Sequence, residues 1–297
     1  MTQLQKAVLK TLAYADIFDY PLTLQEIERW LIKFKAPSSK IKTTIQNAKL
    51  IQAKKGFYFL NGKEELVALR EKREKWSQNK LKIAQKVAKW LKLVPMISMV
   101  AVTGALAMNN ADEEDDIDLL IVTSRDRLWL TRLFTVFLVE LVARRRRPGD
   151  KKVKDKICLN MFLTEDCLRI PPKEQNLFSA HEVYQLKPIW DRNEVYQKFL
   201  AANRWSKNFL PNVMDIKRLR GSQAEKKTTK LTELTNSQKF QCLSLLEKIV
   251  YQLQLRYMRP RKTIEIVEPC RIRFHPQDHQ KRIMLEYKKR LESLKIG

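Results

Sequence analysis

One glycine and two aspartates have the spacing best suited to chemistry in this sequence. Gly104 follows an apolar segment, 96–102, that predicts a buried strand, and it precedes the first turn of a predicted helix. Backbone amides at such a turn can approach a phosphate closely. Asp116 and Asp118 lead into a second apolar run, 119–123, and on a strand their carboxylates point to the same side. Paired carboxylates suit Mg²⁺, so the pattern predicts metal-assisted reaction at a phosphorus atom.

This motif resembles the signature of the DNA polymerase beta-type nucleotidyltransferase superfamily, which includes kanamycin nucleotidyltransferase and the minimal nucleotidyltransferases. The signature is a Gly-Gly or Gly-Ser turn followed by Asp-x-Asp on a strand, and here Gly104-Ala105 precedes Asp116-Ile117-Asp118. The resemblance covers residues 96–124 well and 96–165 in outline. It implies a mixed sheet flanked by helices, with Mg²⁺ held by the two aspartates. The positions that it implies for binding a nucleoside triphosphate (NTP) are Thr103, Gly104 and Ala105.

Two positions depart from the family pattern. Ala105 stands where members usually have Ser or Gly, so a hydroxyl that could bond a phosphate oxygen is missing there. Many members also have a third acid on a later strand, as metal ligand or base. The next predicted strand, 157–163, has Asn160 at its centre, which cannot act as a base at neutral pH. Glu165 and Asp166 follow this strand and could substitute.

Two functional hypotheses therefore stay open. In the first, the protein is an enzyme that moves a nucleoside monophosphate from an NTP to an acceptor hydroxyl and releases pyrophosphate. In the second, the nucleotidyltransferase-like domain is catalytically degenerate, and the protein binds nucleic acid through its N-terminal domain and its basic segments. The acceptor, the preferred base and the choice between DNA and RNA are not determined by the sequence, because this superfamily hosts many acceptors.

Residues 1–62 resemble a winged helix. Three helical segments are followed by a hairpin signal around Lys54-Lys55-Gly56. Thr23-Leu24-Gln25-Glu26 predicts a capping box at the second helix, and Ser38-Ser39 is expected to cap the third. In a winged helix the third helix faces the groove of a duplex, whereas the alternative is a domain used only for packing or partner contacts. The lysines expected to contact phosphates are Lys40, Lys42 and Lys49.

The charge balance points to a polyanionic partner. Formal net charge is +25, from 58 Lys and Arg against 33 Asp and Glu, which attracts nucleotides, DNA or RNA. The alternative is a charge that only keeps the protein in solution. The densest basic cluster is expected either to contact phosphates or to be a solvated loop that caps a helix C-terminus. Its members are Arg144, Arg145, Arg146, Arg147, Lys151 and Lys152.

Compartment signals favour a cytoplasmic protein without a membrane partner. The longest apolar stretch, 128–143, is short of a membrane span and contains Arg132 and Glu140, so a buried helix is predicted. Residues 1–20 lack the features of a signal peptide. The four cysteines form no Cys-x-x-Cys pair, which predicts reduced thiols.

The sequence thus predicts an α+β protein in four parts. They are a winged-helix-like domain at 1–62, a connecting helix at 63–92, a nucleotidyltransferase-like domain at 93–190 and a helical C-terminal region at 191–297. Pro95 ends the connecting helix. The C-terminal helices are expected to close over the site or to bind the acceptor.

Overall fold

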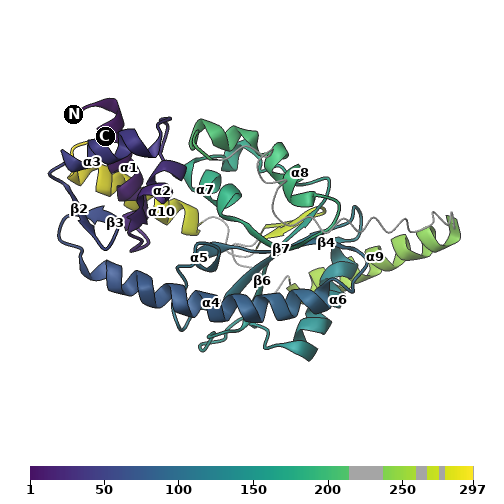
Figure 1. Cartoon of the computed structure of the whole chain (residues 1–297). Helices are drawn as coiled ribbons and strands as arrows, with labels where there is room; N and C mark the ends of the chain where they lie inside the picture. Colours follow the sequence, from purple (N-terminus) through teal and green to yellow (C-terminus); the bar gives the residue numbers. More distant parts are fainter. Residues whose placement is uncertain (214–236, 259–265, 274–277, 297) are drawn as a thin grey trace.

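A six-stranded mixed sheet occupies the centre of the computed structural model, which describes residues 1–213, 237–258, 266–273 and 278–296 (Figure 1). The sheet order is β7-β4-β5-β6-β9-β8. The strands are β4 (Ile97–Val102), β5 (Ile117–Thr123), β6 (Ile157–Thr164), β7 (Lys187–Asp191), β8 (Ile266–Glu268) and β9 (Arg271–Arg273). β5 pairs antiparallel with β4 and parallel with β6. β4 is buried throughout, as its apolar composition, interrupted only by Ser98, predicts.

The first 60 residues form three helices and a small antiparallel sheet of order β1-β3-β2. The predicted capping box is confirmed, because the Thr23 hydroxyl accepts from the Glu26 amide and the Glu26 carboxylate accepts from the Thr23 amide. The expected serine cap of the third helix is wrong, since Pro37 occupies the N-cap position and the Ser38 hydroxyl donates to Glu28 instead. The elements are α1 (Gln3–Asp16), β1 (Leu22–Thr23), α2 (Leu24–Arg29), α3 (Ser38–Gln46), β2 (Ile51–Lys54) and β3 (Phe57–Leu60).

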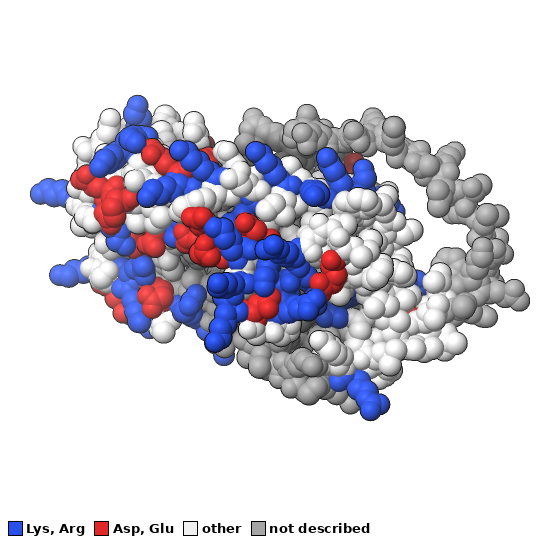
Figure 2. Space-filling view, turned by 90° about the horizontal axis from the view of Figure 1, so that it is seen from below, with Lys and Arg blue, Asp and Glu red and all other residues white. Residues whose placement is uncertain are grey.

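The predicted connecting helix is α4 (Glu65–Leu91), which runs from the N-terminal elements along the sheet (Figure 1). Its inner side is partly polar. Arg70 is buried and bonds Glu26 and the Pro21 carbonyl, and Arg73 bonds Asp112 and the Phe18 carbonyl. α4 therefore joins the N-terminal elements to the sheet through ion pairs as well as apolar packing. Its exposed side belongs to a face on which many Lys and Arg side chains gather, with Asp and Glu among them (Figure 2).

Helices lie on both faces of the sheet. α4 and α6 lie on one face, and α7 and α8 lie on the other (Figure 1). The α-helices that follow α4 in the described residues are α5 (Gly104–Ala107), α6 (Leu128–Val142), α7 (Leu177–Gln185), α8 (Val195–Ala202), α9 (Ser237–Met258) and α10 (Asp278–Ser293), with 3-10 turns η1 (Pro172–Glu174) and η2 (Arg204–Asn208). None of the helices described is both long and apolar enough to cross a membrane.

The C-terminal region differs from its helical prediction. It also supplies β8 and β9, which extend the sheet beyond β6. Strands of three residues are too short to show an alternating pattern, so the sequence did not reveal them. α10 returns to the N-terminal elements, where Arg290 forms an ion pair with the buried Asp16 of α1 at 2.7 Å. The first and last helices are therefore packed together (Figure 1).

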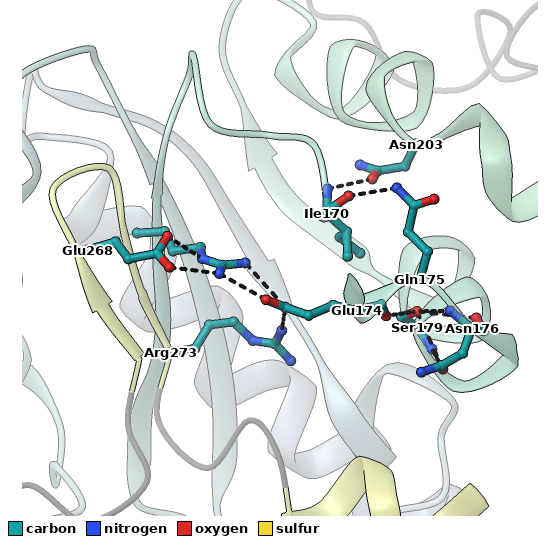
Figure 3. A network of polar contacts seen from close by, with 9 residues as sticks. Ile170, Glu174, Gln175, Asn176, Ser179, Asn203, Glu268 and Arg273 are labelled. Atoms are coloured by element: carbon teal, nitrogen blue, oxygen red, sulfur yellow. Dashed lines mark hydrogen bonds and ion pairs between the residues drawn. The ribbon is translucent and has the colours of Figure 1, made fainter. Parts of the chain in front are cut away.

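The expectation of reduced thiols is wrong for two of the four cysteines. Cys167, after β6, and Cys270, between β8 and β9, form a disulfide across 103 residues of sequence. Only the β6–β9 pairing brings them together, so their spacing could not indicate it. Glu174 joins the same segments, because it bonds Arg273 and Arg271, and Arg271 also bonds Glu268 (Figure 3). Cys158 is a free thiol, and Cys242 lies outside the described side chains.

Helix α6 is buried on one side only. Thr131, Thr135 and Val139 face the interior with no exposed area, whereas Phe137 and Leu141 are 60% and 66% exposed. The sequence predicts a buried helix at 128–143 because the segment is apolar all round. The structure corrects this, because the surrounding elements cover only part of its surface.

Candidate active site

The turn between β4 and α5 places backbone against a carboxylate. Gly104 has a φ of +62°, a left-handed conformation that glycine adopts without strain. A Cβ at this position would lie 3.3 Å from Oδ2 of Asp118, so any side chain would crowd that carboxylate. The Thr103 amide donates to the Asp118 carbonyl at 3.1 Å, which holds the turn against β5. The predicted strand–glycine–helix arrangement is confirmed.

A buried hydroxyl lies beside this turn. Thr103 is 8% exposed, and its Oγ1 has no hydrogen-bond partner among the residues that the structure describes. A buried hydroxyl without a partner is unfavourable, so Thr103 is available to bond a ligand that enters here. The amides of Gly104 and Ala105, in the first turn of α5, likewise have no acceptor within the helix. Thr103 can therefore supply the hydroxyl that Ala105 lacks.

The two aspartates are close neighbours, as predicted. Asp118 is the second residue of β5, and Asp116 directly precedes the strand. Burial, and then the charge of Asp116, raise the pKa of Asp118 to about 7. Asp116 itself forms an ion pair with Arg146 at 2.7 Å. Two carboxylates this close repel each other when both are ionised, and a cation between them would relieve that repulsion.

The neighbour of Asp118 on the next strand is a cysteine. In the parallel pairing of β5 and β6, Cys158 lies opposite Asp118. Single ligand atoms of Asp116, Asp118 and Cys158 lie within 4.8 Å of one another, a grouping that could hold a metal ion. Burial and the nearby carboxylates raise the pKa of the Cys158 thiol. Asn160, the polar position at the centre of the predicted strand, lies two residues further along β6 than Cys158.

One cavity of about 330 Å³ collects most of these groups. At one end it is lined by Thr103, Gly104, Ala105, Asp116 and Asp118. Aromatic side chains line it elsewhere, and they come from α1, the loop that follows it, the C-cap position of α2 and α7. They are Tyr14, Phe18, Tyr20, Trp30, Phe178 and His181. The N-terminal elements therefore form part of the wall of the site, which their position in the sequence did not indicate.

Glu182 on α7 lines the same cavity, and no motif in the sequence indicated it. Its carboxylate has no hydrogen bond or ion pair within the part of the chain that the structure describes. Burial raises its pKa, and its negative charge helps to raise the pKa of Asp118 and of Tyr14. The adjacent His181 is buried. It stacks on Tyr14 with ring centres 4.0 Å apart, and burial lowers its pKa to about 4.

The expected substitutes for a third acid are wrong. Glu165 follows β6 at the end opposite Cys158, and it accepts a hydrogen bond from the Ser98 hydroxyl. Asp166 lies 3.7 Å from Arg125. Both are at the far end of β6 from the paired aspartates, because the site is at the start of β5 and β6 whereas these residues follow the end of β6.

A buried lysine positions the acidic loop before β5. Lys80 of α4 is 2% exposed, and its Nζ donates to the carbonyls of Glu113 and Asp115 at 2.9 and 2.6 Å and to Asp155 Oδ1 at 2.9 Å. The sequence predicts a connecting helix at 63–92 and does not single out Lys80. Helical spacing could have indicated that Lys80 is buried, because buried residues of α4 recur at 77, 80, 84, 87 and 91 along one side of the helix.

The predicted basic cluster is divided between different partners. Only Arg146 reaches the site, through Asp116. Arg145 and Arg147 both form ion pairs with Glu140. The members without a carboxylate partner in the described residues are Arg144, Lys151 and Lys152. The lysines predicted for α3 and its end, which are Lys40, Lys42 and Lys49, are all exposed.

Comparisons with protein-family models, with curated proteins and with solved structures found no match for this chain. Any function must therefore be argued from the geometry of the site.

Proposed function

We propose that this protein is a divalent-cation-dependent nucleotidyltransferase. The acceptor hydroxyl oxygen attacks the α-phosphorus of an NTP, the bond from that phosphorus to the β-phosphate oxygen breaks, and pyrophosphate leaves. One observation carries the proposal. Thr103, Gly104 and the paired aspartates, which come from separate elements, line the same end of one cavity. The family resemblance of the motif is consistent with this arrangement.

The residues present fit a magnesium ion. Asp116 and Asp118 offer adjacent carboxylate oxygens, the ligands that Mg²⁺ prefers. The raised pKa of Asp118 reflects burial together with the charge of Asp116, and a cation bound between the two would favour the ionised form of both. When bound, the ion would neutralise charge on the triphosphate during in-line displacement. The Cys158 thiol beside them is a softer ligand, so Mn²⁺ or Zn²⁺ is also worth testing.

The remaining groups have complementary roles in this proposal. The Thr103 hydroxyl and the amides of Gly104 and Ala105 donate to phosphate oxygens. Arg146 holds Asp116 in place and adds positive charge near the phosphates. Glu182 has a carboxylate with a raised pKa in the same cavity, which suits a base that accepts the proton of the acceptor hydroxyl.

We also propose that the large sheet belongs to a nucleotidyltransferase-type domain and that the N-terminal elements form a winged helix. The order of β4, the glycine turn, β5 antiparallel to β4, and β6 parallel to β5 supports a nucleotidyltransferase-type domain. The N-terminal order of helix, strand, two helices and a hairpin, with sheet order β1-β3-β2, supports a winged helix. Lys55 and Gly56, with φ of 52° and 82°, form the tight turn of its hairpin.

Label transfer tests the enzymatic proposal. The purified chain would be incubated with each α-labelled NTP and Mg²⁺, with and without cellular RNA, beside Asp116→Asn. We expect label to move to an acceptor with release of pyrophosphate, and the variant to lose this activity because it removes a metal ligand. Full transfer by the variant would contradict the proposed roles of the acids. A folded wild-type protein that transferred no label to RNA, protein or small-molecule acceptors would favour the degenerate hypothesis.

Nucleic-acid binding by α3 is a second candidate function. Lys40, Lys42 and Lys49 are exposed and have no carboxylate partner in the described residues. We expect Lys40→Gln/Lys42→Gln/Lys49→Gln to weaken duplex binding and to reduce the slope of log K against log salt by about 3, roughly one per lost phosphate contact. Fluorescence anisotropy over a salt series would measure both.

The matched control for the α3 variant is Lys72→Gln/Lys75→Gln/Lys82→Gln, which removes three lysines of α4. It changes net charge equally but leaves α3 intact. An equal loss of affinity in both variants would show that only overall charge matters, and unchanged binding by the α3 variant would exclude α3 as the interface.

A further inference from the structure

The outer side of α6 is an exposed apolar surface. Leu133 and Phe134 are about half exposed, and Phe137 and Leu141 are exposed further, so four large side chains face solvent within two and a half helical turns. Trp90 near the C-terminal end of α4, which contacts α6, and Leu93 just after that helix are also exposed. We call these six residues the apolar face. Several large apolar side chains exposed on one side of a helix are typical of a surface that binds a partner.

Helix α9 lies against α6 and enlarges the exposed apolar area. Glu247 accepts hydrogen bonds from the Trp129 and Leu130 amides, and the Gln254 side chain donates to the Trp129 carbonyl, so these contacts hold α9 in place. α9 nevertheless leaves large side chains exposed at helical spacing. They are Leu246, Ile249, Leu253 and Tyr257.

A basic hollow of about 520 Å³ adjoins the C-terminal end of α6. Its walls include Val142 and Ala143, two carboxylates (Glu114 and Asp155), and five cations, which are Lys86, Arg144, Lys152, Lys154 and Lys156. Asp155 pairs with the buried Lys80. Lys154 pairs with Glu113 and Glu114, and Lys156 pairs with Asp150. The other three cations have no carboxylate partner in the described residues.

Three such cations around one hollow attract an anion of phosphate type. Figure 2 shows Lys and Arg gathered on this face beside a part of the surface that carries few charges. The basic hollow and the apolar face are therefore adjacent, because Leu141 of the face directly precedes Val142 and Ala143 of the hollow.

We propose that this surface docks on an anionic phospholipid bilayer. Phosphate headgroups occupy the basic hollow, and the side chains of the apolar face enter the boundary between headgroups and acyl chains. Basic residues beside Phe, Leu and Trp on a surface helix are the combination that such a boundary favours. The sequence-based expectation of no membrane partner rested on the absence of a spanning segment, and docking at the surface needs none.

The basic hollow and the apolar face together favour a lipid bilayer over two other binding partners, a nucleic acid and a second copy of this chain. A nucleic-acid backbone would neutralise the hollow but leave Phe137 and Leu141 in water. A second copy of the chain would cover the apolar face but bring like charges of two basic hollows close together, which is unfavourable. An anionic bilayer satisfies both features. The proposal does not depend on the nucleotidyltransferase activity proposed above.

Vesicle co-sedimentation of the full chain tests the proposal. We expect binding to phosphatidylcholine vesicles that contain phosphatidylglycerol, little binding to pure phosphatidylcholine, and weaker binding at higher salt. Lys86→Gln/Arg144→Gln/Lys152→Gln should weaken binding by about a hundredfold, from the loss of three basic contacts. Phe137→Ser/Leu141→Ser should weaken it by at least about tenfold, and both residues are exposed enough for the variant to fold.

Two control variants make the same chemical changes elsewhere. Lys281→Gln/Lys288→Gln/Lys289→Gln removes equal charge from the exposed side of α10, and Leu50→Ser removes an exposed leucine from the N-terminal elements. Both should bind anionic vesicles like the wild type, and circular dichroism would confirm that every variant is folded. If the control variants lost as much affinity for anionic vesicles as the variants of the hollow and the apolar face, the proposal would be overturned. Binding would then depend only on net charge or on general hydrophobicity.

Competing occupants give different results. If wild type binds no anionic vesicle, and the hollow variant instead loses affinity for single-stranded RNA, the surface is a nucleic-acid interface. If sedimentation velocity shows a dimer that Phe137→Ser/Leu141→Ser dissociates, the apolar face joins two copies. Either result would overturn the lipid proposal.

Discussion

Asp118→Asn is expected to lower nucleotidyl transfer by roughly a thousandfold or more while making the folded protein more stable at pH 8. The activity is lost because an amide is a poor ligand for a divalent cation. The stability rises because the wild-type carboxylate is ionised in a buried place beside Asp116. The asparagine side chain has a similar shape without the charge. A substitution that lowers activity and raises stability indicates that the original side chain is needed for activity but destabilises the folded protein.

The pH dependence of this stability follows from the direction of the pKa shift. The pKa of Asp118 rises from 3.8 to about 7 on folding, so the folded state holds the proton more tightly than the unfolded state. The stabilisation from that bound proton is fully present below pH 3.8 and is lost as pH rises to about 7. We therefore expect the difference in unfolding free energy between Asp118→Asn and wild type to grow from pH 5 to pH 8. Urea unfolding at both pH values would measure it.

The control for Asp118→Asn is Asp126→Asn. The Asp126 side chain is 79% exposed and lies beyond the other end of β5, so this variant loses the same charge away from the cavity. Activity and stability should both stay at the wild-type value. Adding Mg²⁺ should stabilise wild type more at pH 8 than at pH 5, because the ligands must be ionised, and should stabilise Asp118→Asn less. Full activity of Asp118→Asn, or a loss of stability at pH 8, would refute this account.

Lys80→Met is expected to destabilise the fold by about 3–5 kcal/mol, the largest stability effect that we predict. The substitution keeps an unbranched side chain but removes the ammonium group that donates to two carbonyls and to Asp155. Those acceptors would then lack a donor beside a buried apolar side chain, which is unfavourable. Chemical denaturation with a two-state fit would give the change in unfolding free energy.

The same variant should also disturb the site. Lys80 holds the loop that carries Asp115 and leads into Asp116, so its loss should lower transfer activity even at temperatures where the variant is folded. Lys82→Met is the matched control, because Lys82 is exposed on the same helix. We expect Lys82→Met to change unfolding free energy by less than about 0.5 kcal/mol. A similarly small change in Lys80→Met would mean that Lys80 does not anchor the loop.

Local patterns predicted much of this structure correctly. The apolar runs before Gly104 and after Asp118 form adjacent strands. Thr23 and Glu26 form the predicted capping box. The predicted hairpin around Gly56 is also present. These features depend on interactions between residues close in sequence or on runs of one residue type. The paired aspartates were predictable for the same reason, because strand geometry places alternate side chains on one side.

The errors in the predicted site involve contacts between distant segments. The register of β5 and β6, which places Cys158 opposite Asp118, cannot be derived from either strand alone. Glu165 and Asp166 were expected nearby, but they lie at the other end of β6. α6 was predicted to be buried because its composition is apolar, yet burial depends on which neighbours cover it.

The sequence by itself determined the chemical groups, the local turn and the strands that carry them, because hydrophobic period, glycine conformation and capping act over a few residues. Tertiary structure decided what surrounds those groups. It placed α1 and Trp30 in the wall of the cavity, Glu182 in the same cavity as the aspartates, Lys80 against the acidic loop and Cys270 against Cys167. The physical reason is that these contacts depend on sheet register and on helix packing across large sequence separations, which no local pattern of residues encodes.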